Sequence, residues 1–202
     1  MFQFFKRKLT FLKKSRQHDS TDQATVPASP KISLAEISQT LSKNFELIHE
    51  IFDNSADLIV RRFTIGALPT EAMVVNLNGM SELKLINDNI IGSLMWETRK
   101  AGLAERITLE YLKDSAINLN AICETGSMDE AVTAILNGDT ALFLDGSAKA
   151  LIMNTRTWAH RGVQQPETEP VVRGSREGFT ETLSINISQI RRKIKDPELY
   201  FE

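Results

Sequence analysis

The sequence has little of what several classes of protein require. Cys123 is the only cysteine among 202 residues, which excludes an internal disulfide and a zinc cluster of cysteines. The longest apolar runs span a handful of residues, far short of the roughly 18 that a membrane-spanning helix needs. The three histidines are scattered without metal-ligand spacing, so we expect neither a metal nor a cofactor.

Motifs for catalysis are missing as well. The sequence contains no Gly-x-Ser-x-Gly, no Gly-x-Gly-x-x-Gly and no Walker lysine motif. The carboxylates that lie close in sequence, such as Asp139 and Asp145, are of the kind usually found in solvated turns, which disfavours acid–base catalysis. We therefore expect a protein that is not an enzyme.

The charge of the chain is nearly balanced overall and uneven along its length. A net charge of -2 argues against a strongly basic nucleic-acid-binding protein, and we expect no nucleic-acid partner. Residues 1–18 nevertheless lack acidic side chains and carry six cations: Lys6, Arg7, Lys8, Lys13, Lys14 and Arg16. Apolar residues at helical spacing lie between them, so this arm is either a solvated flexible tail or a short amphipathic helix that contacts an anionic membrane or a partner.

Residues 17–31 are polar, contain two prolines and show no apolar period, which is typical of a linker. We therefore divide the chain into a basic arm with a disordered linker, residues 1–32, and a folded domain, residues 33–202. Hydrophobic residues at 42% and charged residues at 25% are normal for a globular protein of this kind.

Helices and short strands alternate along the folded domain. A capping box at Ser33–Glu36 predicts a helix over residues 34–53. A second capping box at Ser127–Glu130 predicts a short helix that ends at Leu136. Further helices are predicted from Ser81 to Leu94 and from Ser175, the latter with an apolar stripe that begins at Phe179. Strands are predicted over residues 58–63, 71–77, 119–122, 140–144 and 150–153. The alternation predicts an α/β fold, or α+β, with small mixed sheets packed against amphipathic helices.

The composition of the last two predicted strands indicates whether the faces of the sheet are exposed or covered. Residues 140–144 and 150–153 flank the tight turn Asp145-Gly146 and read as a hairpin. The run of apolar residues in them predicts that both faces of the sheet are covered.

The most informative segment is Pro170–Glu181, which follows a long loop of irregular sequence. It places Arg173 and Arg176 around Gly174 at a predicted helix start, where backbone N–H groups and guanidinium groups together suit an anion or a carboxylate. We favour ion pairs of these arginines with Glu177, Glu181 or a carboxylate of the facing helix, which would fix the loop; anion binding and contact with a partner chain are the alternatives. The candidate ligand or interface residues are Arg173, Gly174, Arg176, Glu177, Gly178, Asp145 and Trp158.

Several motifs occur in the order found in one known family. They are Asp57-Leu-Ile-Val-Arg-Arg-Phe63, Leu85-Ile-Asn-Asp-Asn-Ile-Ile91, Asn137-Gly-Asp-Thr-Ala-Leu-Phe-Leu-Asp-Gly146, Val171-Val-Arg-Gly-Ser-Arg-Glu-Gly-Phe-Thr-Glu-Thr-Leu183 and Arg191-Arg-Lys-Ile-Lys-Asp-Pro197. Over about residues 33–200 the chain resembles the N-terminal cytosolic domain of the A subunit of spore germinant receptors from Bacillus-type spore formers. Ser175 departs from the proline that is common in the family.

The resemblance implies a non-catalytic domain on the cytoplasmic face of the spore inner membrane. It implies the B and C subunits of the receptor and other A subunits as partners, and a role in receptor assembly and in the signal that triggers germination. The family's second subdomain and membrane helices would follow Pro197 and are absent from this chain. The alternative function is a small-molecule or anion-binding module that uses the Arg173/Arg176 loop.

Overall fold

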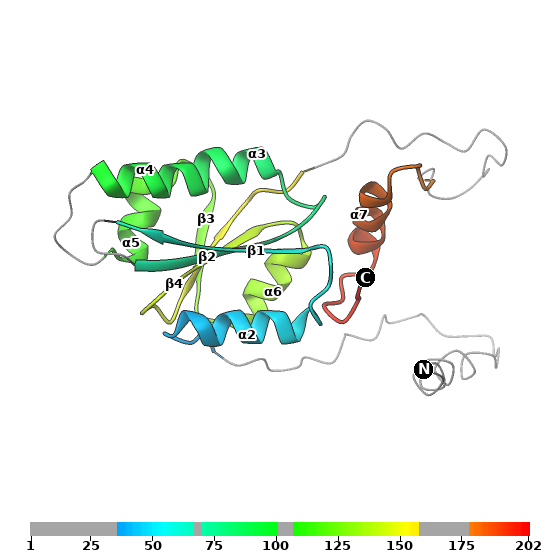
Figure 1. Cartoon of the computed structure of the whole chain (residues 1–202), viewed down its shortest axis with the longest axis horizontal. Coiled ribbons are helices and arrows are strands. Elements are labelled where there is room, and N and C mark those ends of the chain that lie inside the picture. The colour runs from blue at the N-terminus through cyan, green and yellow to red at the C-terminus, as the bar shows by residue number, and fades with distance from the viewer. Residues whose placement is uncertain (1–35, 67–69, 101–106, 158–177) are drawn as a thin grey trace, which may run out of the picture. The chain divides into compact units, whose positions relative to one another are not determined.

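The computed structural model describes four stretches of the chain, which are coloured in Figure 1. They are residues 36–66, 70–100, 107–157 and 178–202. The predicted boundary between residues 32 and 33 lies outside these stretches, so the division into an arm and a domain stays a prediction.

Five strands form a single sheet in the described part of the chain, in the order β1-β2-β4-β5-β3, and all neighbouring strands are antiparallel. The strands are β1 (Leu58–Ile65), β2 (Thr70–Leu77), β3 (Ile122–Thr125), β4 (Thr140–Leu144) and β5 (Ala150–Met153). The helices are α2 (Leu41–Ile51), α3 (Leu83–Leu85), α4 (Ser93–Lys100), α5 (Leu109–Tyr111), α6 (Met128–Leu136) and α7 (Leu183–Lys193), with π-helical segments η1 (Ile86–Gly92) and η2 (Leu112–Ala116). The predicted fold class, a mixed α/β arrangement of helices on a sheet, is confirmed.

Helices cover both faces of the sheet. In Figure 1, α3 and α4 lie on one side of the sheet, and α2 and α6 lie on the other. Alternate side chains of β2 and β4 enter two separate apolar cores, with Met73 and Phe143 on the α2–α6 side and Val74 and Leu142 on the opposite side. All five residues of β4 are buried, which confirms the prediction that its sheet is covered on both faces.

The helix predicted from the second capping box is confirmed. Ser127 is the N-cap residue of α6, and its hydroxyl accepts a hydrogen bond from the backbone N–H of Glu130. The helix ends where Gly138 adopts a φ of +92°, a left-handed conformation that glycine adopts without a steric penalty. The central strand β4 begins directly after this turn.

The helix predicted from the first capping box begins later than expected, so the Ser33–Glu36 prediction is wrong. The N-cap residue of α2 is Thr40, and Glu36 instead forms an isolated antiparallel bridge with Ser127. The backbone N–H of Ile37 donates to the carbonyl of Gly126, at 3.1 Å. Pairing with a distant segment therefore keeps Glu36 and Ile37 out of the helix, and it overrides the local signal for one.

The last helix also begins later than predicted. Phe179 lies before α7, and the side chain of Asn186 bonds both the backbone N–H and the carbonyl of Thr180, at 2.8 and 2.7 Å. These bonds hold the chain in a turn ahead of the N-cap residue Thr182. Ser175, the predicted cap, lies outside the described residues.

We expect Gly138→Ala to lower the free energy of unfolding by at least about 1–2 kcal/mol, because the backbone φ at this position is unfavourable for a residue that carries a Cβ. Its Cβ would also lie 2.7 Å from the carbonyl oxygen of Met80. The matched control is Gly126→Ala, whose Cβ has an ordinary nearest contact of 3.7 Å, and it should change the stability by less than about 1 kcal/mol. Urea denaturation of both variants measures the difference, and equal losses would contradict the prediction.

Candidate functional site

A buried arginine connects α7 to the loop between α2 and β1. The side chain of Arg191 is fully buried, and its guanidinium group makes two hydrogen bonds to the carboxylate of Asp57. The distances are 2.7 Å from Nε to Oδ2 and 2.9 Å from Nη2 to Oδ1. Nη2 also donates to the hydroxyl of Ser55, and Nη1 donates to the carbonyl of Asp196. Bidentate pairing of this kind compensates the cost of burying both charges.

The same cluster holds the last residues of the chain. The backbone N–H of Phe201 donates to the hydroxyl of Ser55 at 3.0 Å, and the carbonyl of Phe201 accepts from the N–H of Ala56 at 2.9 Å. The ring centroid of Phe201 lies 5.1 Å from the guanidinium carbon of Arg191, a cation–π contact. We call Ser55, Asp57, Arg191 and Phe201 the arginine joint.

Local sequence explains how Asp57 reaches this position. Asp53 and Asn54 both adopt a positive φ directly after α2, a conformation that Asp and Asn tolerate better than most residues. The chain reverses there, and the hydroxyl of Ser55 donates to Oδ1 of Asp57 at 2.7 Å. The carboxylate is thus oriented before β1 begins.

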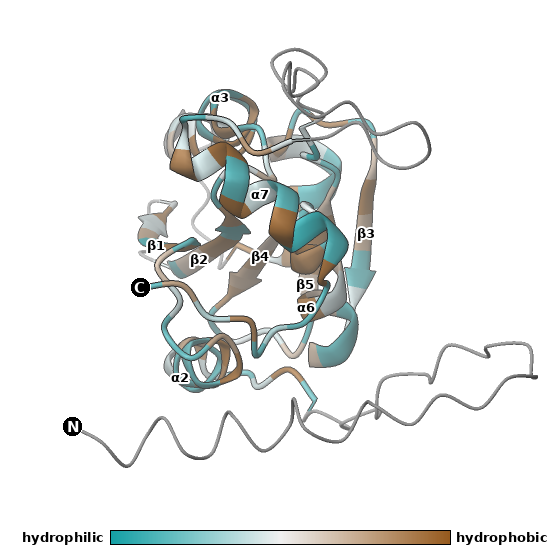
Figure 2. Ribbon diagram, turned by 90° about the vertical axis from the view of Figure 1, so that its right-hand side faces the viewer, coloured by the Kyte–Doolittle hydropathy of each residue, from teal (hydrophilic) through white to brown (hydrophobic). Residues whose placement is uncertain are grey.

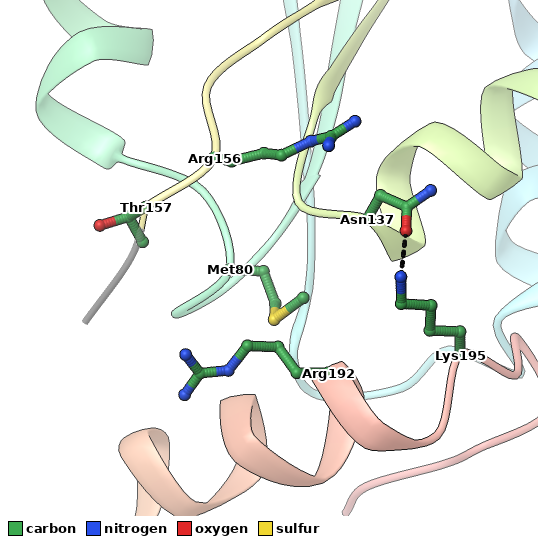
Figure 3. Close-up of a pocket in the computed structure, with 6 residues that line it drawn as sticks. All are labelled: Met80, Asn137, Arg156, Thr157, Arg192 and Lys195. Carbon is green, nitrogen blue, oxygen red and sulfur yellow. Dashed lines mark hydrogen bonds between the residues drawn. The ribbon is translucent and has the colours of Figure 1, made fainter. Parts of the chain in front are cut away.

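A pocket of about 180 Å³ lies near the arginine joint, where the end of α7 meets the ends of other elements. Its walls are formed by the turn after β2, the end of α6, the segment after β5, and the last turn of α7 with the residues that follow it (Figure 3). We call it the α7 pocket, and its lining residues are Met80, Asn137, Arg156, Thr157, Arg192 and Lys195.

Three of the residues that line the α7 pocket are cationic. Arg156 forms two hydrogen bonds with the carboxylate of Asp139, at 2.7 and 2.6 Å, and this partner raises the pKa of the Arg156 guanidinium further above its usual value. Arg192 donates through Nε to the carbonyl of Ser188, and Lys195 donates to Oδ1 of Asn137 at 2.6 Å. Within the described stretches, neither Arg192 nor Lys195 forms a salt bridge.

Most of the site residues predicted from sequence fall outside the described stretches. These are Arg173, Gly174, Arg176, Glu177 and Trp158, so their roles stay predictions.

The two described candidates contact different helices. Oδ1 of Asp145 accepts a hydrogen bond from the backbone N–H of Leu41, the first residue of α2. The carbonyl of Gly178 accepts from the side chain of Gln189 in α7.

Sequence reasoning missed both the arginine joint and the α7 pocket. Asp57 and Arg191 each lie in a motif quoted above, yet nothing in either motif indicates that the two side chains meet across the fold. Among the described residues, no group of three or more His, Cys, Asp or Glu side chains is arranged to hold a metal ion. Each helix in those residues is too short or too polar to cross a bilayer.

Comparison with known proteins identifies a family match over residues 46–202, described as Bacillus/Clostridium GerA spore germination protein. Spore germination protein KA of Bacillus subtilis is 30% identical over 167 residues, which cover 82% of this chain and 30% of that relative. Spore germination protein GerLA of Bacillus cereus is 30% identical over 161 residues, 78% of this chain and 32% of that relative. The chain thus spans about a third of the length of these curated relatives.

A solved structure has the same fold. It is the N-terminal domain of the A subunit of the Bacillus megaterium spore germinant receptor GerK3, with a TM-score of 0.64 and 25% sequence identity. The match covers 82% of this chain and 59% of that domain. None of these three similar proteins, KA, GerLA and the GerK3 domain, is named as an enzyme.

We expect Arg191→Met to lower the free energy of unfolding by about 3–5 kcal/mol, because Asp57 would be left buried without its charge partner. The matched control is Arg62→Met, which removes an exposed ion pair with Glu71 and should cost less than about 1 kcal/mol. Chemical denaturation of both variants measures the two losses.

A double variant tests the cause of that loss. Arg191→Met combined with Asp57→Leu removes both buried charges and should recover part of the stability. Equal stability of Arg191→Met and Arg62→Met would show that the joint contributes no more than a surface pair.

Proposed function

Because the chain belongs to the GerA family of Bacillus and Clostridium spore germination proteins, we propose that it is the N-terminal domain of the A subunit of a nutrient germinant receptor. The observation that carries this proposal is the fold it shares with the A-subunit domain of GerK3 over 82% of the chain. The identity of 25% over that span supports a common role as well as a common fold.

In this proposal the domain is one part of a longer protein. The chain spans 30% of the length of spore germination protein KA, which leaves room for a second subdomain and membrane helices in the full-length receptor subunit. The domain would then lie on the cytoplasmic face of the spore inner membrane. The basic arm, rich in lysine and arginine, would suit the anionic surface of that membrane.

We further propose a role that is structural and signalling, without catalysis. The arginine joint supports this role because the side chains of Ser55, Asp57 and Arg191 are buried and paired with one another. A shift of α7 relative to the sheet would unpair the charges of Arg191 and Asp57, which costs several kcal/mol. The joint would therefore couple α7 to the sheet, so that a movement of the sheet also moves α7 and the segments connected to α7.

The proposed partners are the B and C subunits of the receptor and other copies of the A subunit. The solved relative is itself named as the A subunit of a germinant receptor, which supports assembly with further subunits.

The proposal is tested in spores that carry the full-length gene with Arg191→Met. We expect either a reduced level of the subunit, measured by immunoblot, or a normal level with a slowed fall in optical density after nutrient addition. The first result indicates a role in assembly, and the second a role in signal transduction.

Arg62→Met serves as the matched control and should leave both the subunit level and the nutrient response unchanged, since its ion pair is exposed. A normal level and a normal nutrient response with Arg191→Met, in a domain that the same change destabilises in solution, would refute the proposal.

A further inference from the structure

Helix α7 docks on the protein with its polar face inward. Its buried residues are Ser188, Gln189 and Arg191, all of them polar. Figure 1 places α7 at one end of the sheet, and Figure 2, which views that end, shows hydrophobic segments recurring along the helix. An amphipathic helix at the surface of a globular protein normally does the reverse and buries its apolar face.

The apolar residues of α7 form a regular stripe that is largely uncovered. Leu183 is 71% exposed and Ile194, at the end of the helix, is 48% exposed. Ile187 and Ile190 between them are half-buried and belong to neither apolar core. We call these four residues the α7 stripe. A contiguous apolar surface of this kind marks an interaction site more often than isolated apolar residues do.

We propose that the α7 stripe binds the α7 stripe of a second copy of this chain, with the two helices antiparallel. Its residues follow one another at spacings of four, three and four. These are the spacings of the a and d positions of a coiled coil, where apolar side chains of one helix insert between those of another. The pattern therefore fits a helix as the occupant of the stripe.

The same spacing makes the α7 stripe complementary to itself. Because the order four, three, four is unchanged when it is reversed, an antiparallel copy brings Leu183 opposite Ile194 of the other copy. Ile187 then lies opposite Ile190 of the other copy, so each layer of the contact consists of two apolar residues. A contact of this two-fold kind closes as a dimer and covers the whole stripe in both copies.

The charges at the two ends of α7 favour the antiparallel arrangement. Glu181 precedes the helix, and its last turn contains Arg192 and Lys193. A parallel pair would bring the basic ends of both copies together, which is unfavourable. An antiparallel pair instead places the basic end of each helix near Glu181 of the other copy.

The charge around the α7 stripe does not suit an anionic membrane. Helices that lie on such membranes carry an excess of lysine and arginine. Residues 178–202 contain as many acidic as basic side chains, and one of the basic ones, Arg191, is paired with Asp57. The acidic residues are Glu181, Asp196, Glu198 and Glu202.

Sedimentation equilibrium of the unchanged 202-residue chain at increasing concentration gives the first test. Four apolar layers make a small interface, so we expect a reversible dimer with a dissociation constant on the order of 10–100 µM. A chain that stays monomeric well above that range overturns the proposal, and binding of this monomer to anionic lipid vesicles would assign the stripe to a membrane instead. The inference goes beyond the proposed function and rests on α7 alone, so it can fail while the spore experiment succeeds.

The variant that tests the α7 stripe is Leu183→Glu. It should weaken the dimer by at least about tenfold, because it places a charge in both outer apolar layers. Leu83→Glu is the matched control: it makes the same change at a leucine of α3 that is 43% exposed and lies outside the stripe, and the dissociation constant should stay within about twofold. Equal effects of the two variants on the dissociation constant would overturn the proposal.

Cysteine cross-linking tests the antiparallel register in a chain that carries Cys123→Ser. Leu183→Cys combined with Ile194→Cys should form a disulfide-linked dimer under mild oxidation, because the two positions meet between copies. Leu183→Cys without the second change should not cross-link. Its two copies would lie about 16 Å apart along the helix axis, beyond the roughly 7 Å between Cα atoms that a disulfide spans. Cross-linking of the single variant, or none in the combined variant, would overturn the antiparallel dimer.

Discussion

The buried ion pair between Arg191 and Asp57 is the contact on which the position of α7 depends. The buried residues of α7 are Ser188, Gln189 and Arg191, all of them polar, whereas Leu183 at its start is 71% exposed. The isoleucines Ile185, Ile187 and Ile190 of α7 are half-buried and belong to neither apolar core, so hydrogen bonds to a paired charge supplement apolar burial in the docking of this helix. Gly79 adds a steric constraint, because a Cβ there would lie 3.1 Å from the Cβ of Ser188.

The rest of the fold is held together by a different kind of force. Two apolar cores cover the sheet, and in Figure 2 the strands β2 and β4 are largely hydrophobic while hydrophilic residues recur along α7. Burial of apolar surface is not directional, whereas a buried ion pair is stable only in one geometry. The arginine joint and the α7 pocket are both formed in part by α7 and the residues that follow it.

How far the sequence predicts this fold is clearest from its two capping boxes. Ser127–Glu130 opens α6 as predicted, but Ser33–Glu36 does not open α2, although the two motifs are chemically alike. Glu36 pairs instead with the backbone of Ser127 across the fold. A local motif predicts a helix reliably only where no distant segment offers the same backbone groups a better partner.

The amino-acid order by itself determined four of the five strands, most of the helices and the family, because each depends on residues that are close together in the chain; β3 was predicted at residues 119–122 and lies at Ile122–Thr125. Hydrophobic period, turn residues such as Gly138 and the quoted motifs are all signals of this local kind. Only the tertiary structure decided that Asp57 meets Arg191, and that Arg192 and Lys195 share a pocket with Arg156. These partners come from segments far apart in sequence, and the packing of helices on the sheet is what brings their charges together.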